Sequence, residues 1–209
     1  MKFVSLISSG IDSPVATYLI SKKADEMIFV HSENRPFTDN HEINNFIVIA
    51  KYLKKKIRPK VKAYIVPHGP SLTSYKGRCE DKYTCVFCKR MMVRYAEKIG
   101  EKENADAVIM GDSLGQVASQ TLQNLRVVDS AVKMPVLRPL IGLDKEDIVK
   151  IAKKIGTYEL SIQPSGGCNA VPHKPSTKAK FDAILKEEKK LDIKKIVKEA
   201  IVRAKLLDL

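Results

Sequence analysis

Residues 2–13, Lys-Phe-Val-Ser-Leu-Ile-Ser-Ser-Gly-Ile-Asp-Ser, decide the fold. The apolar run Phe3–Ile7 has the length of a buried parallel strand and leads into a turn of small residues. Gly10 lets the backbone turn closely, and Pro14 suits the first turn of a helix. The amides of such a turn lie at the positive end of a helix dipole, so the stretch predicts an anion cradle. An ordinary strand–turn–helix connection would show the same pattern.

Length and composition limit the class of protein. The chain has 209 residues, of which 44% are hydrophobic, and this is enough for one substantial core. No apolar run approaches the roughly 20 residues that span a bilayer, and Phe3–Ile7 is too short for a signal-peptide core. We therefore expect a cytoplasmic protein.

The formal net charge of +13 indicates an anionic partner such as RNA, although a solvated basic surface would give the same figure. Residues 51–62 carry seven Lys and Arg residues and no acid, which makes this stretch the better candidate for RNA contact. The tail from Lys174 onward interleaves acids with bases and is typical of amphipathic helices with salt-bridged faces.

Apolar runs alternate with helix-like stretches along the chain, a rhythm typical of a parallel α/β sheet. We expect a doubly wound fold over residues 1–175, with ligand at the carboxyl ends of the strands, and a helical extension over 176–209 packed on it. Residues 67–83 are long and polar for a connection, which predicts a functional or mobile loop. The expected strands are Phe3–Ile7, Met27–Val30, Val61–Val66, Ala107–Met110 and Val132–Leu137, and the expected helices are Val15–Lys22, Ile43–Lys55, Lys89–Ile99, Val117–Val128, Lys145–Ile155, Thr177–Lys189 and Ile193–Leu207.

Further motifs follow in a fixed order. Residues 111–121 read Gly-Asp-Ser-Leu-Gly-Gln-Val-Ala-Ser-Gln-Thr, residues 137–146 contain Leu-Arg-Pro-Leu-Ile and Asp-Lys-Glu, and residues 166–179 contain Gly-Gly-Cys and Lys-Pro-Ser-Thr-Lys-Ala. Together with the first turn, this order resembles the PP-loop domain of ThiI-type tRNA 4-thiouridine synthetases from residue 2 to about residue 185. The resemblance implies a PP-loop ATP pyrophosphatase fold and an ATP-dependent tRNA sulfurtransferase that releases AMP and pyrophosphate.

The resemblance also implies the site. A carbonyl oxygen of uridine in tRNA would attack the α-phosphate of ATP, and sulfur would then displace AMP. Mg²⁺ would bridge the phosphates, with Asp12 as an orienting group. His31 is equally well explained as a packed residue at a strand end. The implied ATP-binding residues are Leu6, Ile7, Ser8, Gly10, Asp12, Ser13, His31, Ser32, Lys89, Gly111 and Gln120.

The chain departs from the family pattern in three ways. Ser9 stands where the family has glycine, and a left-handed backbone there would cost roughly 1 kcal/mol. No THUMP region precedes the first strand, so we expect a stand-alone PP-loop domain that meets tRNA directly or through a separate chain. No rhodanese-like domain follows, so the source of sulfur is open. The sequence does not determine the oligomeric state.

The cysteines offer three kinds of sulfur chemistry. By resemblance Cys168 lies in the catalytic-cysteine loop, where a thiolate could attack an adenylated carbon or pass on sulfur. Cys85 and Cys88 form a Cys-x-x-Cys pair at a helix start, and with Cys168 they could hold a [4Fe-4S] cluster with one open iron. A zinc site that adds Cys79 is the second option, and a metal-free dithiol that releases sulfur from a Cys168 persulfide is the third.

Two other functions compete with sulfur transfer. One is a PP-loop ligase that forms an amide on a small molecule and holds structural zinc. The other is a non-catalytic RNA-binding subunit that has lost ATP hydrolysis, for which Ser9 is the hint.

Overall fold

A six-stranded sheet is the middle layer of the computed structural model, which describes residues 1–209. The strands lie in the order β5-β4-β1-β2-β3-β6. The first five are parallel, and β6 pairs antiparallel with β3. The predicted α/β fold is confirmed. The strands are β1 (Lys2–Leu6), β2 (Glu26–Glu33), β3 (Lys60–Pro67), β4 (Ala107–Ile109), β5 (Val136–Leu137) and β6 (Lys205–Leu207).

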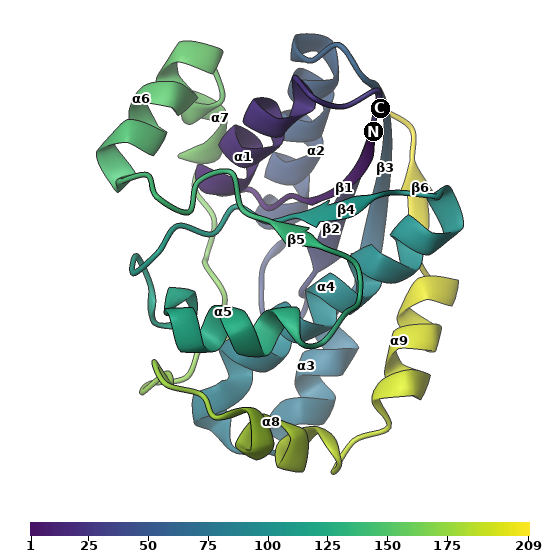
Figure 1. Ribbon diagram of the computed structural model, residues 1–209, viewed down its shortest axis with the longest axis vertical. Helices are drawn as coiled ribbons and strands as arrows, with labels where there is room; N and C mark the ends of the chain where they lie inside the picture. The colour runs from purple at the N-terminus through teal and green to yellow at the C-terminus, as the bar shows by residue number, and fades with distance from the viewer.

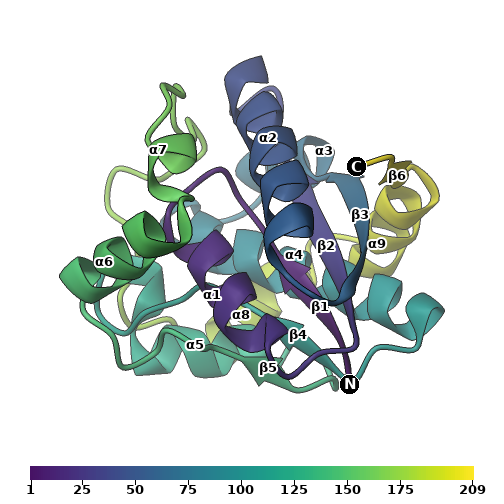
Figure 2. The same ribbon diagram turned by 90° about the horizontal axis from the view of Figure 1, so that it is seen from above.

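Helices cover both faces of this sheet (Figures 1 and 2). On one face lie α1 (Asp12–Ser21), α2 (Asn40–Lys56), α6 (Lys145–Ile155) and the short α7 (Tyr158–Ser161). On the other lie α3 (Gly69–Lys76), α4 (Thr84–Glu103), α5 (Leu122–Asp129), α8 (Phe181–Glu188) and α9 (Ile193–Val202), with 3₁₀ turns at Asp81–Tyr83 and Ala118–Gln120.

The first strand shows why both faces are covered. Val4 and Leu6 point into the core beneath α4, whereas Phe3 and Ile7 point into the core beneath α1 and α2, and all four are buried. Successive side chains of a strand point to opposite faces, so a strand that is apolar at nearly every position requires a layer of helices on each side.

The connections leave β1 in opposite directions. Through α1 the chain moves to β2 and β3, and it later returns to β4 and β5 on the other side of β1. In such sheets the carboxyl ends of the two strands where the order reverses form a crevice that binds ligands. Here that crevice lies between β1 and β4.

Two expected connections differ from the structure. Residues 67–83 are not an open loop, because α3 occupies Gly69–Lys76 and buries Leu72 and Tyr75 on one face. The predicted strand Val132–Leu137 is reduced to Val136–Leu137, since the amides of Lys133 and Met134 donate instead to the Glu97 side chain, at 2.6 and 3.0 Å.

Two expected helices also change. The stretch Val117–Val128 is divided at Thr121, whose hydroxyl caps α5 by accepting the Asn124 amide at 3.3 Å. The last helix ends at Val202 rather than Leu207, and the chain extends into β6 along the edge of β3. Ile184, Leu191, Val197 and Ala200 of the C-terminal segment belong to the same core as β1 and α4. The division of the chain at residue 175 stays a prediction.

Both chain ends lie at the amino edge of the sheet. Lys2 begins β1 there, and β6 runs antiparallel to β3, so that it returns the C-terminus to this edge. The Lys54 ammonium donates to the Leu209 carbonyl oxygen at 2.6 Å. No helix is long and apolar enough to cross a membrane.

Candidate functional site

A cavity of about 600 Å³ opens at the carboxyl ends of β1 and β4, at the crevice where the strand order reverses. Its wall brings together segments far apart in the sequence, among them the turn after β1, the start of α4, the stretch after β4, the start of α6 and the irregular segment before α8. The sequence-predicted site residues in this wall are Leu6, Ser8, Gly10, Asp12, Ser13, Cys85, Cys88, Lys89, Gly111, Gln120 and Cys168.

The turn after β1 is closed by its own serines. The Ser8 amide donates to the Ser13 hydroxyl at 2.9 Å, and the Gly10 amide donates to the Ser8 hydroxyl at 3.2 Å. The first amides of α1 have no partner within the helix, so this closed turn presents them at the positive end of the helix dipole. Among residues other than glycine, Asn104 alone has a positive φ. The backbone of Ser9 is therefore not left-handed, and the cost that such a backbone would carry does not arise.

Gly111 is required by a close approach of two backbones. A Cβ at this position would lie 2.7 Å from the nitrogen and Cα of Ser13. Real Cβ atoms are not found this close to backbone atoms, so only glycine lets the end of β4 contact the start of α1. The floor of the crevice thus depends on the absence of a side chain.

A buried ion cluster lies beside this floor. The Asp112 carboxylate accepts from the Lys89 ammonium at 2.7 Å and from Arg138 Nε at 3.0 Å. Burial alone raises the pKa of Asp112, but these two cations outweigh it and hold the pKa below its ordinary value. Asp112 and Arg138 were not among the predicted site residues, although both lie inside the motifs quoted from the sequence.

Three more wall residues were missed. The Lys145 ammonium contacts the Asp12 carboxylate at 2.5 Å, and both line the cavity. Oδ1 of Asn34 and Oε1 of Gln120 are buried in the wall without a hydrogen-bond partner, and Ser161 lines the wall nearby.

Three predicted site residues lie outside the cavity wall. Ile7 is buried in the core beneath α1. His31 stacks on Phe46 with ring centroids 4.3 Å apart, and its nitrogens face the Ile7 carbonyl oxygen at 2.9 Å and the Glu42 carboxylate at 2.8 Å. Ser32 follows it and is buried. His31 therefore packs against the residue that precedes the turn, as the packed strand-end histidine that the sequence also allowed.

Three thiols line the same cavity. Cys85 and Cys88 lie in the first turns of α4, and Cys168 lies on the irregular segment between α7 and α8. Burial, and then the negative charge of a Cys168 thiolate, raise the pKa of Cys85. The same two causes, with Cys85 added, raise the pKa of Cys88 to about 12.

The thiols are not arranged as a metal site. No group of three or more His, Cys, Asp or Glu side chains is placed to hold a metal ion. The Cys88 sulfur lies 3.3 Å from Nε2 of His68 and 3.8 Å from the Met92 sulfur, and the Cys79 thiol donates to the Glu187 carbonyl oxygen at 3.5 Å. Neither the predicted Cys85, Cys88 and Cys168 set nor the four-cysteine zinc set is assembled, because Cys88 and Cys79 turn toward other partners.

Comparison with known proteins decides the family. The family model described as ThiI, thiamine biosynthesis protein, matches residues 1–193. The chain belongs to the ThiI family. A Methanosarcina mazei protein named "Probable tRNA sulfurtransferase" is 43% identical over 209 residues, which are 100% of this chain and 52% of that protein.

One solved structure supports membership of the ThiI family, and a second shares the fold. The crystal structure of a 4-thiouridine synthetase–RNA complex with bound ATP matches with a TM-score of 0.93 and 37% identity, over 99% of this chain and 54% of that one. An NMN synthetase from Francisella tularensis matches with a TM-score of 0.61 and 14% identity, over 96% of this chain and 84% of that one, and shares the fold alone. This ThiI-family chain spans about half the length of the curated relatives it matches.

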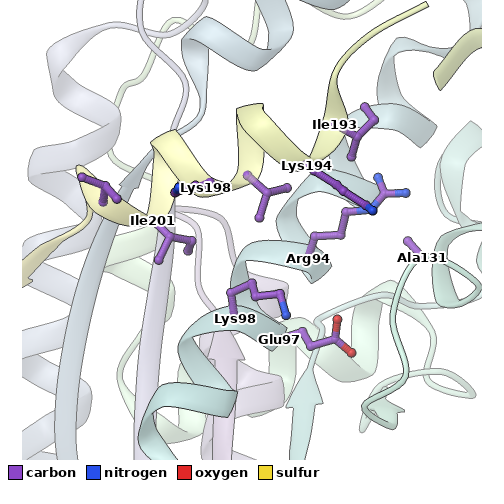
Figure 3. A pocket seen from close by; sticks show the side chains of 10 residues that line it. Arg94, Glu97, Lys98, Ala131, Ile193, Lys194, Lys198 and Ile201 are labelled. Carbon is purple, nitrogen blue, oxygen red and sulfur yellow. The ribbon is translucent and has the colours of Figure 1, made fainter. Parts of the chain in front are cut away.

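Two surface features of this ThiI-family chain lie away from the cavity. The basic stretch 51–62 joins the end of α2 to the start of β3, at the amino edge of the sheet and opposite the cavity. A second cavity of about 550 Å³ lies between α4 and α9, where Arg94, Lys98, Lys194 and Lys198 rim an apolar lining (Figure 3). It contains none of the predicted site residues.

Proposed function

We propose that this chain is the catalytic part of an ATP-dependent tRNA sulfurtransferase that makes 4-thiouridine. The observation that carries the proposal is that an anion cradle and three thiols face one cavity. Membership of the ThiI family and the likeness to an ATP-bound 4-thiouridine synthetase–RNA complex support it. A tRNA substrate also favours the predicted cytoplasmic location.

The nucleotide half of the cavity suits adenylation. The turn after β1 would hold the β- and γ-phosphates on backbone amides, and Lys89 would offset the charge that develops at the α-phosphate when the uridine oxygen attacks it. Asp12 is the carboxylate of the turn that lines the cavity, so it would hold Mg²⁺ bound with ATP, and the ion would offset phosphate charge. The side chains of Asn34 and Gln120 also line the cavity and would lie beside the nucleoside.

The thiol half suits release of sulfur from a persulfide. A persulfide donor would exchange its outer sulfur onto the Cys168 thiol and keep its own thiol. The Cys85 thiolate would then attack the Cys168 sulfur, forming a Cys85–Cys168 disulfide. The outer sulfur leaves as hydrosulfide with the electron pair of the broken S–S bond, attacks the adenylated carbon and displaces AMP. A dithiol reductant would return the disulfide to two thiols.

A cluster or a zinc ion would require the thiols to move together. The residues as placed do not fit either metal, because no three ligands converge. Metal and acid-labile sulfide analysis of protein purified without oxygen tests this directly. The persulfide route requires no stoichiometric metal, whereas iron with sulfide that is lost from a Cys85→Ala/Cys88→Ala variant would replace that route with a [4Fe-4S] one.

The function itself is tested by single-turnover reaction with tRNA transcript, ATP and a low-molecular-weight persulfide, followed by nucleoside mass spectrometry. We expect one 4-thiouridine, one AMP and one pyrophosphate per turnover. Cys168→Ser should lose thiolation by at least about 10³-fold while it keeps ATP binding. Cys79→Ser, a cysteine outside the cavity, is the matched control. AMP release without thiolation at any tRNA uridine would overturn the proposal.

RNA contact by residues 51–62 remains part of this proposal. Because the stretch lies at the edge opposite the cavity, the part of an RNA that it contacts differs from the part that enters the cavity.

A further inference from the structure

The segment that carries Cys168 has almost no regular structure of its own. Between α7 and α8, residues 162–180 form no helix or strand, and Gly167 in the middle has φ +67°. A reacting thiol gains from being held close to its partner before reaction. The bonds that hold this segment from outside therefore determine how Cys168 faces Cys85.

The connection between β2 and α2 supplies those bonds next to Cys168. The Gly166 amide donates to Oδ2 of Asp39 at 3.0 Å, and the Asn169 amide donates to the Phe37 carbonyl oxygen at 2.8 Å. The two anchored amides flank Cys168 on either side. Asp39 and Gly166 are 127 positions apart in the sequence, so this contact is purely tertiary.

Asp39 holds the segment from a rigid support. Its other oxygen, Oδ1, accepts the His41 and Glu42 amides at 3.0 and 3.2 Å and caps α2. The connection also packs closely against the start of α3, because a Cβ on Gly69 would lie 1.6 Å from the Arg35 carbonyl oxygen. The hydrogen bond from Gly166 lowers the pKa of Asp39, so the carboxylate remains charged and accepting.

From this geometry we infer that Asp39 is a positioning residue, whose second carboxylate oxygen sets the approach of Cys168 to Cys85. The inference rests on the proposed function, since that function gives the approach its purpose. Gly166 fits the same role, because a Cβ there would lie 3.2 Å from Oδ2 of Asp39 and would require this contact to shift by a few tenths of an ångström.

Asp39→Asn separates the two roles of the side chain. Asparagine caps helices about as well as aspartate, so α2 keeps its cap, but an NH₂ group replaces the oxygen that faces the Gly166 amide. The matched control is Asp192→Asn, because Asp192 caps α9 by accepting the Lys195 amide at 3.0 Å, away from the cavity. Gly166→Ala is the second variant, with Gly142→Ala, which has open space around it, as its control.

The first measurement is the initial rate of Cys85–Cys168 disulfide formation with diamide, followed by peptide mass spectrometry. Diamide takes two electrons and two protons from the thiol pair and becomes the hydrazine. We expect Asp39→Asn and Gly166→Ala to lower this rate at least fivefold, and both controls to keep it within twofold. A wild-type rate in Asp39→Asn, or no Cys85–Cys168 disulfide in the wild type, would overturn the inference.

The second measurement separates this inference from the proposed function. In the thiolation reaction, Asp39→Asn should lower the single-turnover rate about as much as it lowers the disulfide rate, while the KM for ATP in pyrophosphate release stays unchanged. Loss of ATP affinity instead would show a structural effect and reject positioning. If the wild type forms the disulfide rapidly but makes no thiolated nucleoside, the proposed function fails and the role of Asp39 in thiol approach stands.

Discussion

The two halves of the cavity are built differently. In the nucleotide half, the groups follow directly from strand ends and helix starts, and serines five residues apart close the turn. In the thiol half, Cys168 lies on an irregular segment that is held by contacts from α2 and its preceding connection. The difference lies in what fixes each half: the turn after β1 is fixed by its own residues, whereas the Cys168 segment is fixed by hydrogen bonds from a distant part of the chain.

The largest expected effect on ATP binding comes from a substitution in the nucleotide half. Gly111→Ala would place a Cβ 2.7 Å from the Ser13 backbone and force the start of α1 away from β4. We expect ATP affinity to fall at least about 100-fold, or ~3 kcal/mol, measured by calorimetry. Gly142→Ala is the control, and the Cys85–Cys168 disulfide should still form in both. Unchanged ATP affinity would mean that the two backbones separate without cost.

A smaller effect is expected from the ion cluster between the halves. Lys89→Met removes one of the two cations on the buried Asp112 carboxylate, and in the proposed function it also removes the cation that would offset phosphate charge. We expect the rate of pyrophosphate release to fall about 30-fold, or ~2 kcal/mol. Lys98→Met, in the same helix but exposed, should leave the rate within twofold. Equal rates in both variants would remove Lys89 from the nucleotide half.

Acid should lower the stability of the protein through a buried ion cluster in α8. In this helix, Glu188 is buried against Arg90 and Arg94. Burial raises the pKa of Glu188, but the two guanidinium groups outweigh it and lower the pKa to about 2. The stabilisation is thus present above pH about 4.5 and is lost as pH falls toward 2.

We expect the free energy of unfolding to drop by about 1–2 kcal/mol over that window, measured by urea denaturation. In Glu188→Gln, which is less stable at neutral pH, this part of the pH dependence should be absent. An identical slope in wild type and variant would assign the drop to other carboxylates.

The smallest effect is expected at Ser9. Since the backbone of Ser9 is not left-handed, Ser9→Gly relieves no strain and should change the KM for ATP by less than about twofold, or ~0.4 kcal/mol. Steady-state pyrophosphate release measures it. A large gain in activity would instead favour the non-catalytic RNA-binding subunit for the natural chain.

The sequence pattern predicted the elements that are formed by residues close together in the chain. The strand, turn and helix of residues 2–21 are encoded by a short apolar run, small residues and Pro14, and the structure has them in that order. The doubly wound sheet follows from the alternation of elements. By contrast, α3 was missed because a Gly-Pro start and a polar composition hide the two side chains it buries, Leu72 and Tyr75.

What the sequence could not reveal depends on tertiary pairing. Lys205–Leu207 continues an apolar pattern compatible with helix, and its pairing with β3 decides otherwise. The Asp112 cluster joins residues 23 and 26 positions apart, and Asp39 reaches Gly166 across 127 positions. The thiol set followed from a spacing and a resemblance, but side-chain direction, such as Cys88 toward His68, is fixed only by packing.

The position of the two chain ends limits the reach of anything attached there. Both ends lie at the amino edge of the sheet, whereas the cavity lies at the carboxyl edge. The eight residues of β2 correspond to a height of about 26 Å between these edges. A tether from either end would therefore require about eight extended residues to reach the thiols, so a short tag or surface anchor would leave the mouth of the cavity clear.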